Sequence, residues 1–310
     1  GAMNGGTASN CIFILNTAAD GNENVGTAEE NCESVPIVIN ASDFNTIYND
    51  GGKFIFQIVA GNQVLTGVNT TISIIKNGTP YANYSVLSGS DWIVNLPAGT
   101  YQAILSIEGS NVEPVTKTIT VAKSPAKITA SAVTATYNVN KYLVIKLTDG
   151  KGNPLSGVNV TVTLGTAKTY TTDKNGQIKI NVAKLVPKTY TAKISFAGND
   201  NYTAFTKSVK VTVKKATPKL TAKAKTFKVK VKTKKYTVTL KNNKGAVLKK
   251  VKLTLKVGKK TYKATTNSKG KATFKITKLT KKGKYTAVIK FAGNKYYKAL
   301  SKKVKITVKK

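Results

Sequence analysis

Apolar and polar residues alternate strictly along several stretches of this chain. The clearest runs cover residues 158–164, 227–232 and 251–257, where every second residue is Val, Leu or Phe. A period of two places all the apolar side chains of a run on one face, which predicts half-buried β-strands. Val, Ile, Thr and Tyr dominate these runs, and such residues suit a pleated surface that is packed on one side. No segment shows a convincing helical period.

Turn signals separate these runs. Clusters of Gly, Asn and Asp recur at a spacing of roughly ten residues, which is typical of a β-sandwich and not of alternating strands and helices. In the N-terminal third, residues 53–58 and 68–74 predict strands, and Asn77-Gly78 predicts a tight hairpin turn. The sequence therefore predicts an all-β protein.

A long internal repeat organises the chain. Residues 187–215 recur as residues 283–310, and in both copies Tyr-Thr-Ala leads to Phe-Ala-Gly-Asn before the copy ends in Thr-Val-Lys-Lys. Residues 97–109 are a more diverged version of the same segment. Self-similarity at a fixed period indicates tandem equivalent domains. A repeat of about 90 residues is long enough to enclose its own core between two small sheets.

The repeat and the turn signals divide the chain into four segments. Short joins near Pro125 and Pro218 separate the last three, and proline stiffens such joins because it cannot donate to a strand ladder. We therefore expect tandem β-sandwich domains in an extended, semi-rigid rod. The first predicted segment, residues 1–35, contains a remnant of a purification tag (Gly1-Ala2-Met3) and a disulfide-stapled stretch. The other three are a diverged sandwich (residues 36–123), a repeat (residues 124–215) and a lysine-rich repeat (residues 216–310).

Cys11 and Cys32 are the only cysteines of the chain. In a surface β-protein we expect them to form one disulfide, which would stabilise the N-terminal segment by on the order of 3 kcal/mol. The enclosed stretch is polar and acidic, so a stapled tip of this kind is a candidate recognition surface. The alternative is two free thiols in a reducing cytoplasm.

Charge is distributed very unevenly along the chain. Residues 1–123 carry 4 Lys and 10 acidic residues, residues 124–215 carry 14 Lys and 3 acidic residues, and residues 216–310 carry 32 Lys and no acidic residue. This asymmetry predicts that the two ends face different partners. The basic end should bind polyanions in a salt-dependent manner.

All 50 basic residues are lysine. Reading of guanine and bidentate phosphate recognition rely on arginine, and no helix is expected that could enter a groove, so specific nucleic-acid binding is not expected. An anionic cell-wall polymer or surface glycan fits better. The alternative is a solvated surface in a lysine-biased genome, although self-repulsion at this density opposes folding. The candidate polyanion-binding residues are Lys228, Lys230, Lys232, Lys252, Lys256, Lys303 and Lys305.

The composition argues against enzymatic chemistry. The chain has no histidine, which excludes histidine-based triads and imidazole metal ligands. Asp149, Asp173 and Asp200 are the only acids of residues 124–215, and each lies in a predicted turn, where we expect it to shape the turn. Oxygen ligands near Asp173 and Asp200 are too few for a good calcium site. We expect no catalytic residue, no metal site and no cofactor, and we assign Trp92 to the core and not to sugar stacking.

The motifs described above resemble bacterial-type immunoglobulin-like repeats, which implies tandem immunoglobulin-like β-sandwich domains. The lysine-rich, arginine-free composition resembles adhesin-like surface proteins of methanogenic archaea. The resemblance covers residues 124–310 well and residues 36–123 weakly. It implies that Tyr190, Phe196 and Gly198, with Tyr285, Phe291 and Gly293 in the last repeat, are core and turn positions. It also implies acid-assisted lysine–asparagine crosslinks in related proteins, for which Lys53 with Glu108 or Asp91 is the candidate here.

Together these observations predict a non-enzymatic, extracellular, adhesin-like surface protein that is monomeric and has no membrane span. The basic segment would bind an anionic envelope polymer, or a glycan or protein on another cell. Either end could be the adhesive one. The main alternative is a structural stalk of a larger surface protein with no ligand site of its own, and a weaker one is an accessory to an envelope enzyme.

Overall fold

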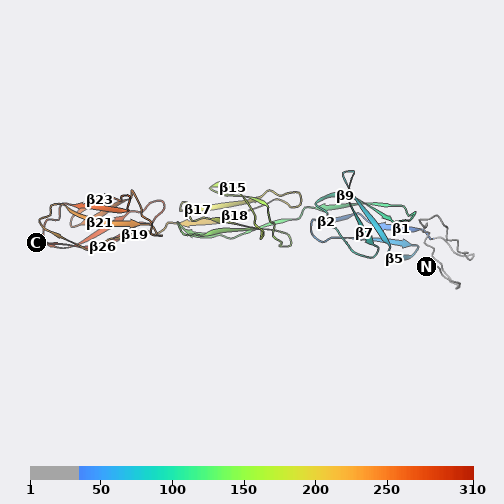
Figure 1. Ribbon diagram of the computed structural model, residues 1–310, viewed down its shortest axis with the longest axis horizontal. Helices are drawn as coiled ribbons and strands as arrows, with labels where there is room; N and C mark the ends of the chain where they lie inside the picture. Colours follow the sequence, from blue (N-terminus) through green and yellow to red (C-terminus); the bar gives the residue numbers. More distant parts are fainter. Residues whose placement is uncertain (1–34) are drawn as a thin grey trace, which may run out of the picture. The chain divides into compact units, whose positions relative to one another are not determined.

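The computed structural model describes residues 35–310, and every regular element in them is a β-strand (Figure 1). The predicted disulfide between Cys11 and Cys32 lies outside these residues. No helix in the described part is long and apolar enough to cross a membrane. The all-β prediction is therefore confirmed.

The third sandwich, residues 216–310, consists of two sheets. Its five-stranded sheet has the order β20-β26-β25-β22-β23, in which β20 runs parallel to β26 and the other neighbours are antiparallel. The three-stranded sheet comprises β19 (Lys219–Thr221), β21 (Lys234–Lys241) and β24 (Lys271–Ile276). The five-stranded sheet comprises β20 (Lys225–Lys228), β22 (Lys252–Val257), β23 (Lys260–Thr265), β25 (Gly283–Phe291) and β26 (Leu300–Lys309).

The second sandwich, residues 124–215, has the same topology. Its sheets have the orders β11-β13-β16 and β12-β18-β17-β14-β15, again with one parallel pair, β12 and β18. The sequence repeat therefore corresponds to a repeat of strand order and direction. The strands are β11 (Ala126–Ala130), β12 (Val133–Thr136), β13 (Tyr142–Asp149), β14 (Asn159–Leu164), β15 (Thr166–Thr171), β16 (Gln177–Asn181), β17 (Thr189–Phe196) and β18 (Phe205–Lys214).

The first sandwich, residues 35–123, keeps the five-stranded sheet in the order β2-β10-β9-β6-β7 but divides the other sheet. One part has the order β1-β4-β5, and the other is the pair β3-β8. The strands are β1 (Ile37–Ala41), β2 (Phe44–Ile47), β3 (Lys53–Phe54), β4 (Phe56–Ala60), β5 (Gln63–Leu65), β6 (Asn69–Lys76), β7 (Thr79–Leu87), β8 (Trp92–Ile93), β9 (Gly99–Ile107) and β10 (Val115–Ala122).

Two strand predictions are wrong in their extent. The predicted strand 53–58 breaks at Ile55, which is 68% exposed, because β3 pairs with β8 while β4 pairs with β1 and β5. The predicted strand 227–232 ends at Lys228, and a turn follows at Val229-Lys230. In both places the alternation continues past the point where the strand has a partner.

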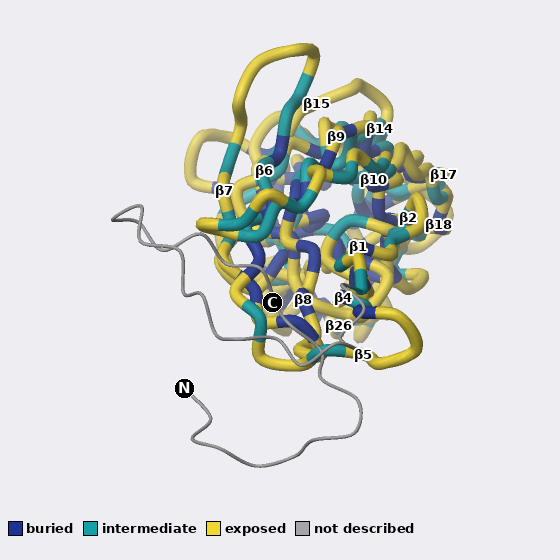
Figure 2. The backbone as a smooth tube through the Cα atoms, turned by 90° about the vertical axis from the view of Figure 1, so that its right-hand side faces the viewer, coloured by how far each residue is buried: buried dark blue, intermediate teal, exposed yellow. Residues whose placement is uncertain are grey.

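The alternating strands bury their apolar faces inside each sandwich, where the buried segments are dark blue in Figure 2. Trp92 is only 7% exposed and packs against Phe54 and Tyr84, with ring centroids 5.7 and 4.9 Å away. Its assignment to the core is confirmed. Phe196 and Phe291 are likewise buried.

A tyrosine hydrogen bond recurs in all three sandwiches. The hydroxyl groups of Tyr101, Tyr190 and Tyr285 each donate, at 2.8 Å, to the carbonyl four residues upstream. This is the arrangement of the tyrosine corner in immunoglobulin-type sandwiches. Together with the strand orders, it defines the protein as a tandem of immunoglobulin-like β-sandwiches.

Removing this hydrogen bond is expected to lower stability modestly. Tyr190→Phe should destabilise the second sandwich by about 0.5–1.5 kcal/mol, because the carbonyl of Val186 loses its donor. Tyr142→Phe is the matched control, since that half-exposed side chain makes no hydrogen bond within residues 35–310. Denaturant midpoints of the two variants compare them directly, and equal midpoints would contradict the assignment.

The described chain packs as two compact units. One contains the residues up to Lys127 together with the turns Thr148–Asn153 and Ala197–Phe205 of the second sandwich, and the other contains the remaining residues.

Within each compact unit, the first residue of a sandwich pairs with the loop that precedes the last strand of the same sandwich, and a tyrosine of the preceding sandwich packs on that loop. In the first unit, Ser124 and Tyr202 form a parallel β-bridge, and the ring of Tyr48 packs edge-on against Tyr202 at 5.6 Å. In the second unit, Ala216 forms the same bridge to Tyr297, and Tyr137 packs edge-on against Tyr297 at 5.7 Å. The two joins thus use equivalent residues.

Candidate functional site

The third sandwich exposes alternating lysine and threonine residues on the outer side of its five-stranded sheet. Their neighbours along each strand, such as Leu255, Ile289 and Ile306, are buried in the core, so the period of two places the polar residues in solvent. We call the outer surface the lysine–threonine face. It consists of Thr226 and Lys228 on β20, Lys252, Thr254 and Lys256 on β22, Thr261, Lys263 and Thr265 on β23, Lys284, Thr286, Val288 and Lys290 on β25, and Ser301, Lys303, Lys305, Thr307 and Lys309 on β26.

The strand register keeps the lysines of this face apart. Lys256 lies opposite Thr261, Lys305 lies opposite Thr286, and Lys290 lies opposite Ser301 on one side and Thr254 on the other. Lys228, opposite Lys309, is the exception. Like charges directly opposite each other are destabilising, whereas diagonal neighbours are about 7–8 Å apart. The positive charges of the face are therefore regularly spaced, with hydroxyl side chains between most of them.

The three-stranded sheet of the same sandwich lacks this spacing. Lys235 lies directly opposite Lys275, and Lys219 lies directly opposite Lys241. Both faces of the sandwich are basic and both carry threonines. On the three-stranded sheet, however, the hydroxyls of Thr237 and Thr273 pair with each other at 2.8 Å, and two pairs of lysines lie directly opposite each other.

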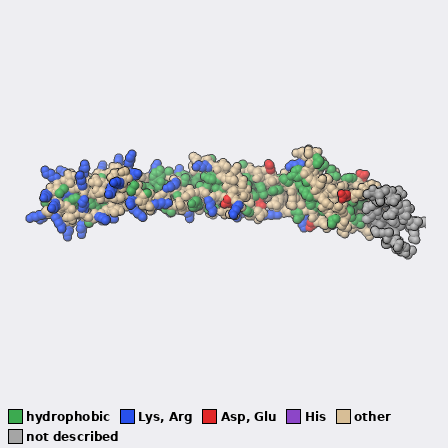
Figure 3. All heavy atoms as spheres, in the orientation of Figure 1, with side chains coloured by type: hydrophobic (Ala, Val, Ile, Leu, Met, Phe, Trp, Pro, Cys, Tyr) green, Lys and Arg blue, Asp and Glu red, His purple; other side chains and the backbone are tan. Residues whose placement is uncertain are grey.

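The lysines of the third sandwich have no carboxylate side-chain partner within that sandwich, because residues 216–310 contain no acid. In the part of the chain that the structure describes, the one ion pair joins Lys53 to Asp91 in the first sandwich, at 2.5 Å. In Figure 3 the lysine atoms gather over the third sandwich on the visible face.

The fold itself does not require the third sandwich to lack acids. In the second sandwich, Asp149 accepts backbone hydrogen bonds from Lys151 and Asn153 at 3.0 and 2.8 Å. Asn242 occupies the equivalent turn and accepts two equivalent bonds at 2.9 Å. The third sandwich therefore keeps the turn geometry and omits the negative charge.

A second turn shows the same replacement. Asp173 accepts from the backbone of Asn175 and Gln177 at 2.8 and 2.9 Å, and Asn267 accepts in the same way in the third sandwich, at 2.9 and 3.0 Å. The prediction that Asp149 and Asp173 shape turns is confirmed.

The hydrogen bonds of Asp173 make the second sandwich sensitive to acid. The backbone N–H of Gln177 is the main cause that holds the pKa of Asp173 below its ordinary value, so the carboxylate favours the folded state. This stabilisation is present above the unfolded pKa of about 3.9 and disappears as the pH falls through the folded value. Asp173→Asn should reduce the loss of stability between pH 5 and pH 2, as measured by denaturant unfolding. An unchanged pH dependence would contradict this role.

The structure brings together five of the seven candidate lysines. Lys228, Lys252, Lys256, Lys303 and Lys305 lie on the lysine–threonine face, whereas Lys230 and Lys232 lie in the turn and bend after β20. Four further lysines of the face were not among the candidates, although the period of two in residues 260–265, 283–291 and 300–309 contains the signal. These additional residues are Lys263, Lys284, Lys290 and Lys309.

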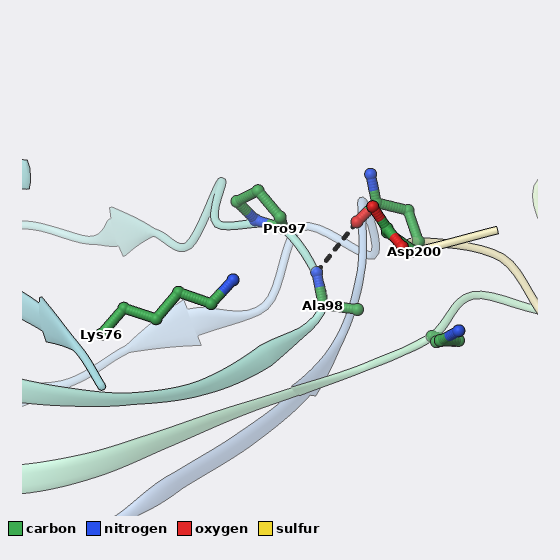
Figure 4. Close-up of a pocket in the computed structure, with 6 residues that line it drawn as sticks. Lys76, Pro97, Ala98 and Asp200 are labelled. Carbon is green, nitrogen blue, oxygen red and sulfur yellow. Dashed lines mark hydrogen bonds between the residues drawn. The ribbon is translucent and has the colours of Figure 1, made fainter. Parts of the chain in front are cut away.

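A pocket of about 480 Å³ lies in the first compact unit (Figure 4). Its wall is fixed by the side-chain oxygen of Asn201, which accepts from the backbone N–H of Ala98 at 3.0 Å. The remaining lining residues are Lys76, Pro97, Lys123 and Asp200. Two amines and one carboxylate with no nucleophile–base pair provide no catalytic arrangement.

Other candidate sites gain no support from the geometry. Of the two acids considered for a crosslink, Asp91 lies beside Lys53, but the side chains are 52% and 57% exposed and the pair is well solvated. Glu108 instead accepts from Asn69 at 3.3 Å. No group of three or more potential ligands among His, Cys, Asp and Glu occurs within residues 35–310.

No protein-family model matches the sequence, and no curated protein matches it. Among solved structures, it is similar to a bacterial ice-binding adhesin (14% identity, 88% of this chain and 99% of the other, TM-score 0.29) and to the I67–I69 fragment of titin (11%, 90% and 100%, TM-score 0.37). It is also similar to fibronectin(III)-like modules of Clostridium thermocellum CbhA (20%, 59% and 94%, TM-score 0.25). These are tandem immunoglobulin-like or fibronectin-like modules, and at such scores they carry no argument about function or source organism.

Proposed function

We propose that this chain is a non-enzymatic, adhesin-like protein of the cell surface, whose third sandwich binds an anionic envelope polymer or glycan. The observation that carries the proposal is the acid-free third sandwich, in which asparagine replaces two of the three aspartates of the second, Asp149 and Asp173, while the turn hydrogen bonds are unchanged. Its lysines therefore lack carboxylate side-chain partners within the sandwich. A polyanion would supply that missing charge and relieve the self-repulsion.

Two directions of attachment are compatible with this proposal. In the first, the basic sandwich anchors the protein in its own anionic envelope, and the acidic N-terminal end binds a partner. In the second, the lysine–threonine face itself is adhesive and binds glycans of another cell. Loss of attachment to the producing cell after deletion of residues 216–310 supports the first direction, and loss of binding to foreign cells supports the second.

Deletion of the third sandwich is also the direct test of the proposal. The full chain should be retained on immobilised polygalacturonate at 50 mM NaCl, and a chain ending at residue 215 should elute early. The shorter chain still carries 18 lysines, so it controls for scattered surface charge. Equal retention of both chains would contradict the proposal.

A structural stalk is the second candidate, and the joins favour it. Ser124 and Ala216 make equivalent bridges, and an edge-on tyrosine pair supports each of them. Repeated joins of one kind suit a spacer that needs no ligand. In that case, deletion of residues 216–310 would change neither attachment to the producing cell nor binding to other cells.

A further inference from the structure

We propose that the ligand of the lysine–threonine face is an acidic polysaccharide, which the lysines bind through its acidic groups and the threonine hydroxyls bind through its sugar hydroxyls. This inference rests on the proposed polyanion binding and adds the chemical class of the polymer and the face that holds it.

The hydroxyl groups of this face are available to a ligand. On the equivalent face of the second sandwich, hydroxyls pair across strands: Thr161 with Thr169 at 3.5 Å, Thr189 with Thr212 at 3.4 Å, and Thr206 with Ser195 at 3.3 Å. On the lysine–threonine face, most threonines lie opposite lysines, and within residues 216–310 the hydroxyls of Thr254 and Thr286 make no hydrogen bond to the protein. Replacing alternate hydroxyls with lysine thus leaves the remaining hydroxyls unpaired.

The spacing of the charges suits an extended chain with regularly placed acidic groups. Lysines two residues apart on one strand, such as Lys303 and Lys305, are separated by about 6.5–7 Å, and diagonal neighbours by about 7–8 Å. Lys256, Lys290 and Lys303 surround Val288 at the centre of the face. A linear polymer that lies across the face can therefore place successive acidic groups next to successive lysines.

The face lacks the groups that nucleic-acid binders use. Tyr262 and Tyr285, the tyrosines of its strands, pack against the core and not outward. Without exposed aromatic rings there is no platform for base stacking. Without arginine there is no bidentate phosphate fork, whereas lysine is a point charge that pairs with any acidic group. Charged groups interleaved with hydroxyl groups match a charged polyol best.

The test compares two triple variants of the full chain with the same net charge. Lys256→Thr, Lys290→Thr and Lys303→Thr together remove the centre of the lysine–threonine face. Lys235→Thr, Lys271→Thr and Lys275→Thr remove three lysines of the three-stranded sheet. Threonine suits strands, so both variants should fold. The first should weaken binding to polygalacturonate at 50 mM NaCl by roughly 10- to 100-fold, and the second by much less.

A charge-neutral pair of substitutions tests the hydroxyl groups. Thr254→Val with Thr286→Val keeps the shape and the net charge. This variant should bind polygalacturonate roughly fivefold to tenfold more weakly than the original chain, and poly-glutamate, which has no hydroxyls, equally well.

The outcomes separate this inference from the proposed function. If the original chain binds neither polymer, polyanion binding itself is wrong. If it binds both, but the two triple variants weaken equally and the valine variant is unchanged, net charge alone explains binding and this inference is overturned. Equally tight, face-dependent binding of single-stranded poly-dT would overturn it in favour of a nucleic acid.

Discussion

Replacing Lys234 with alanine is expected to destabilise the third sandwich by about 2–4 kcal/mol. Lys234 begins β21 and is only 1% exposed. Its amine donates to the carbonyl of Val231 at 2.6 Å and points toward the carbonyl of Val229 at 3.5 Å. Alanine would leave a cavity in place of the aliphatic stem and remove the donor for the turn that follows β20.

The neighbouring Lys235 provides a matched control, since its side chain is exposed on the same strand. Lys235→Ala removes the same charge and should change stability by less than about 0.5 kcal/mol. Hydrogen exchange of the amides in residues 216–310 of the full chain measures both variants. If Lys234→Ala exchanges no faster than Lys235→Ala, the buried lysine does not support the fold.

Introducing the three acids of the second sandwich at the equivalent positions of the third is expected to weaken polyanion binding by roughly tenfold. Asn242→Asp, Asn267→Asp and Lys295→Asp reproduce the acids of the second sandwich at equivalent positions and lower the net charge by four. Each charge is worth about 0.3–0.5 kcal/mol at screened surface distances, and 1.4 kcal/mol corresponds to a factor of ten. The fold should tolerate the first two changes, because aspartate occupies both turns in the second sandwich.

Affinity for polygalacturonate at 50 mM NaCl is the readout for this triple variant. Its control is Asn242→Ser with Asn267→Ser, which alters the same turns at constant charge and should retain the affinity. Unchanged affinity of the acidic variant would show that the absence of acids has no part in binding.

Much of the fold could be predicted because it depends on patterns of neighbouring residues in the sequence. The period of two identified which residues face the core, and the repeat around Tyr190 and Tyr285 identified equivalent positions. Trp92 was assigned correctly because a sandwich core needs large apolar side chains. Asp149 and Asp173 were assigned correctly because a short acidic side chain beside glycine or asparagine favours a turn.

The parts that were missed depend on the pairing of strands. Alternation identifies a face but not the partner strand, so the break at Ile55 and the end of β20 at Lys228 could not be predicted. The regular spacing of the lysines depends on the strand register, which places Lys290 opposite Thr254 and not opposite another lysine. For Lys234 the signal was present, since it shares the inward positions of Tyr236 and Val238, but lysine in a lysine-rich run resembles a surface residue.

The salt dependence of binding by the full chain tests the central claim most directly. With five to seven lysines in contact with the polymer, the slope of log affinity against log salt should be about −3 to −5. Raising NaCl from 50 to 200 mM should therefore weaken binding to polygalacturonate by roughly 100- to 1,000-fold. A slope near zero would show that the lysines of the third sandwich do not make the contacts, and would contradict the account.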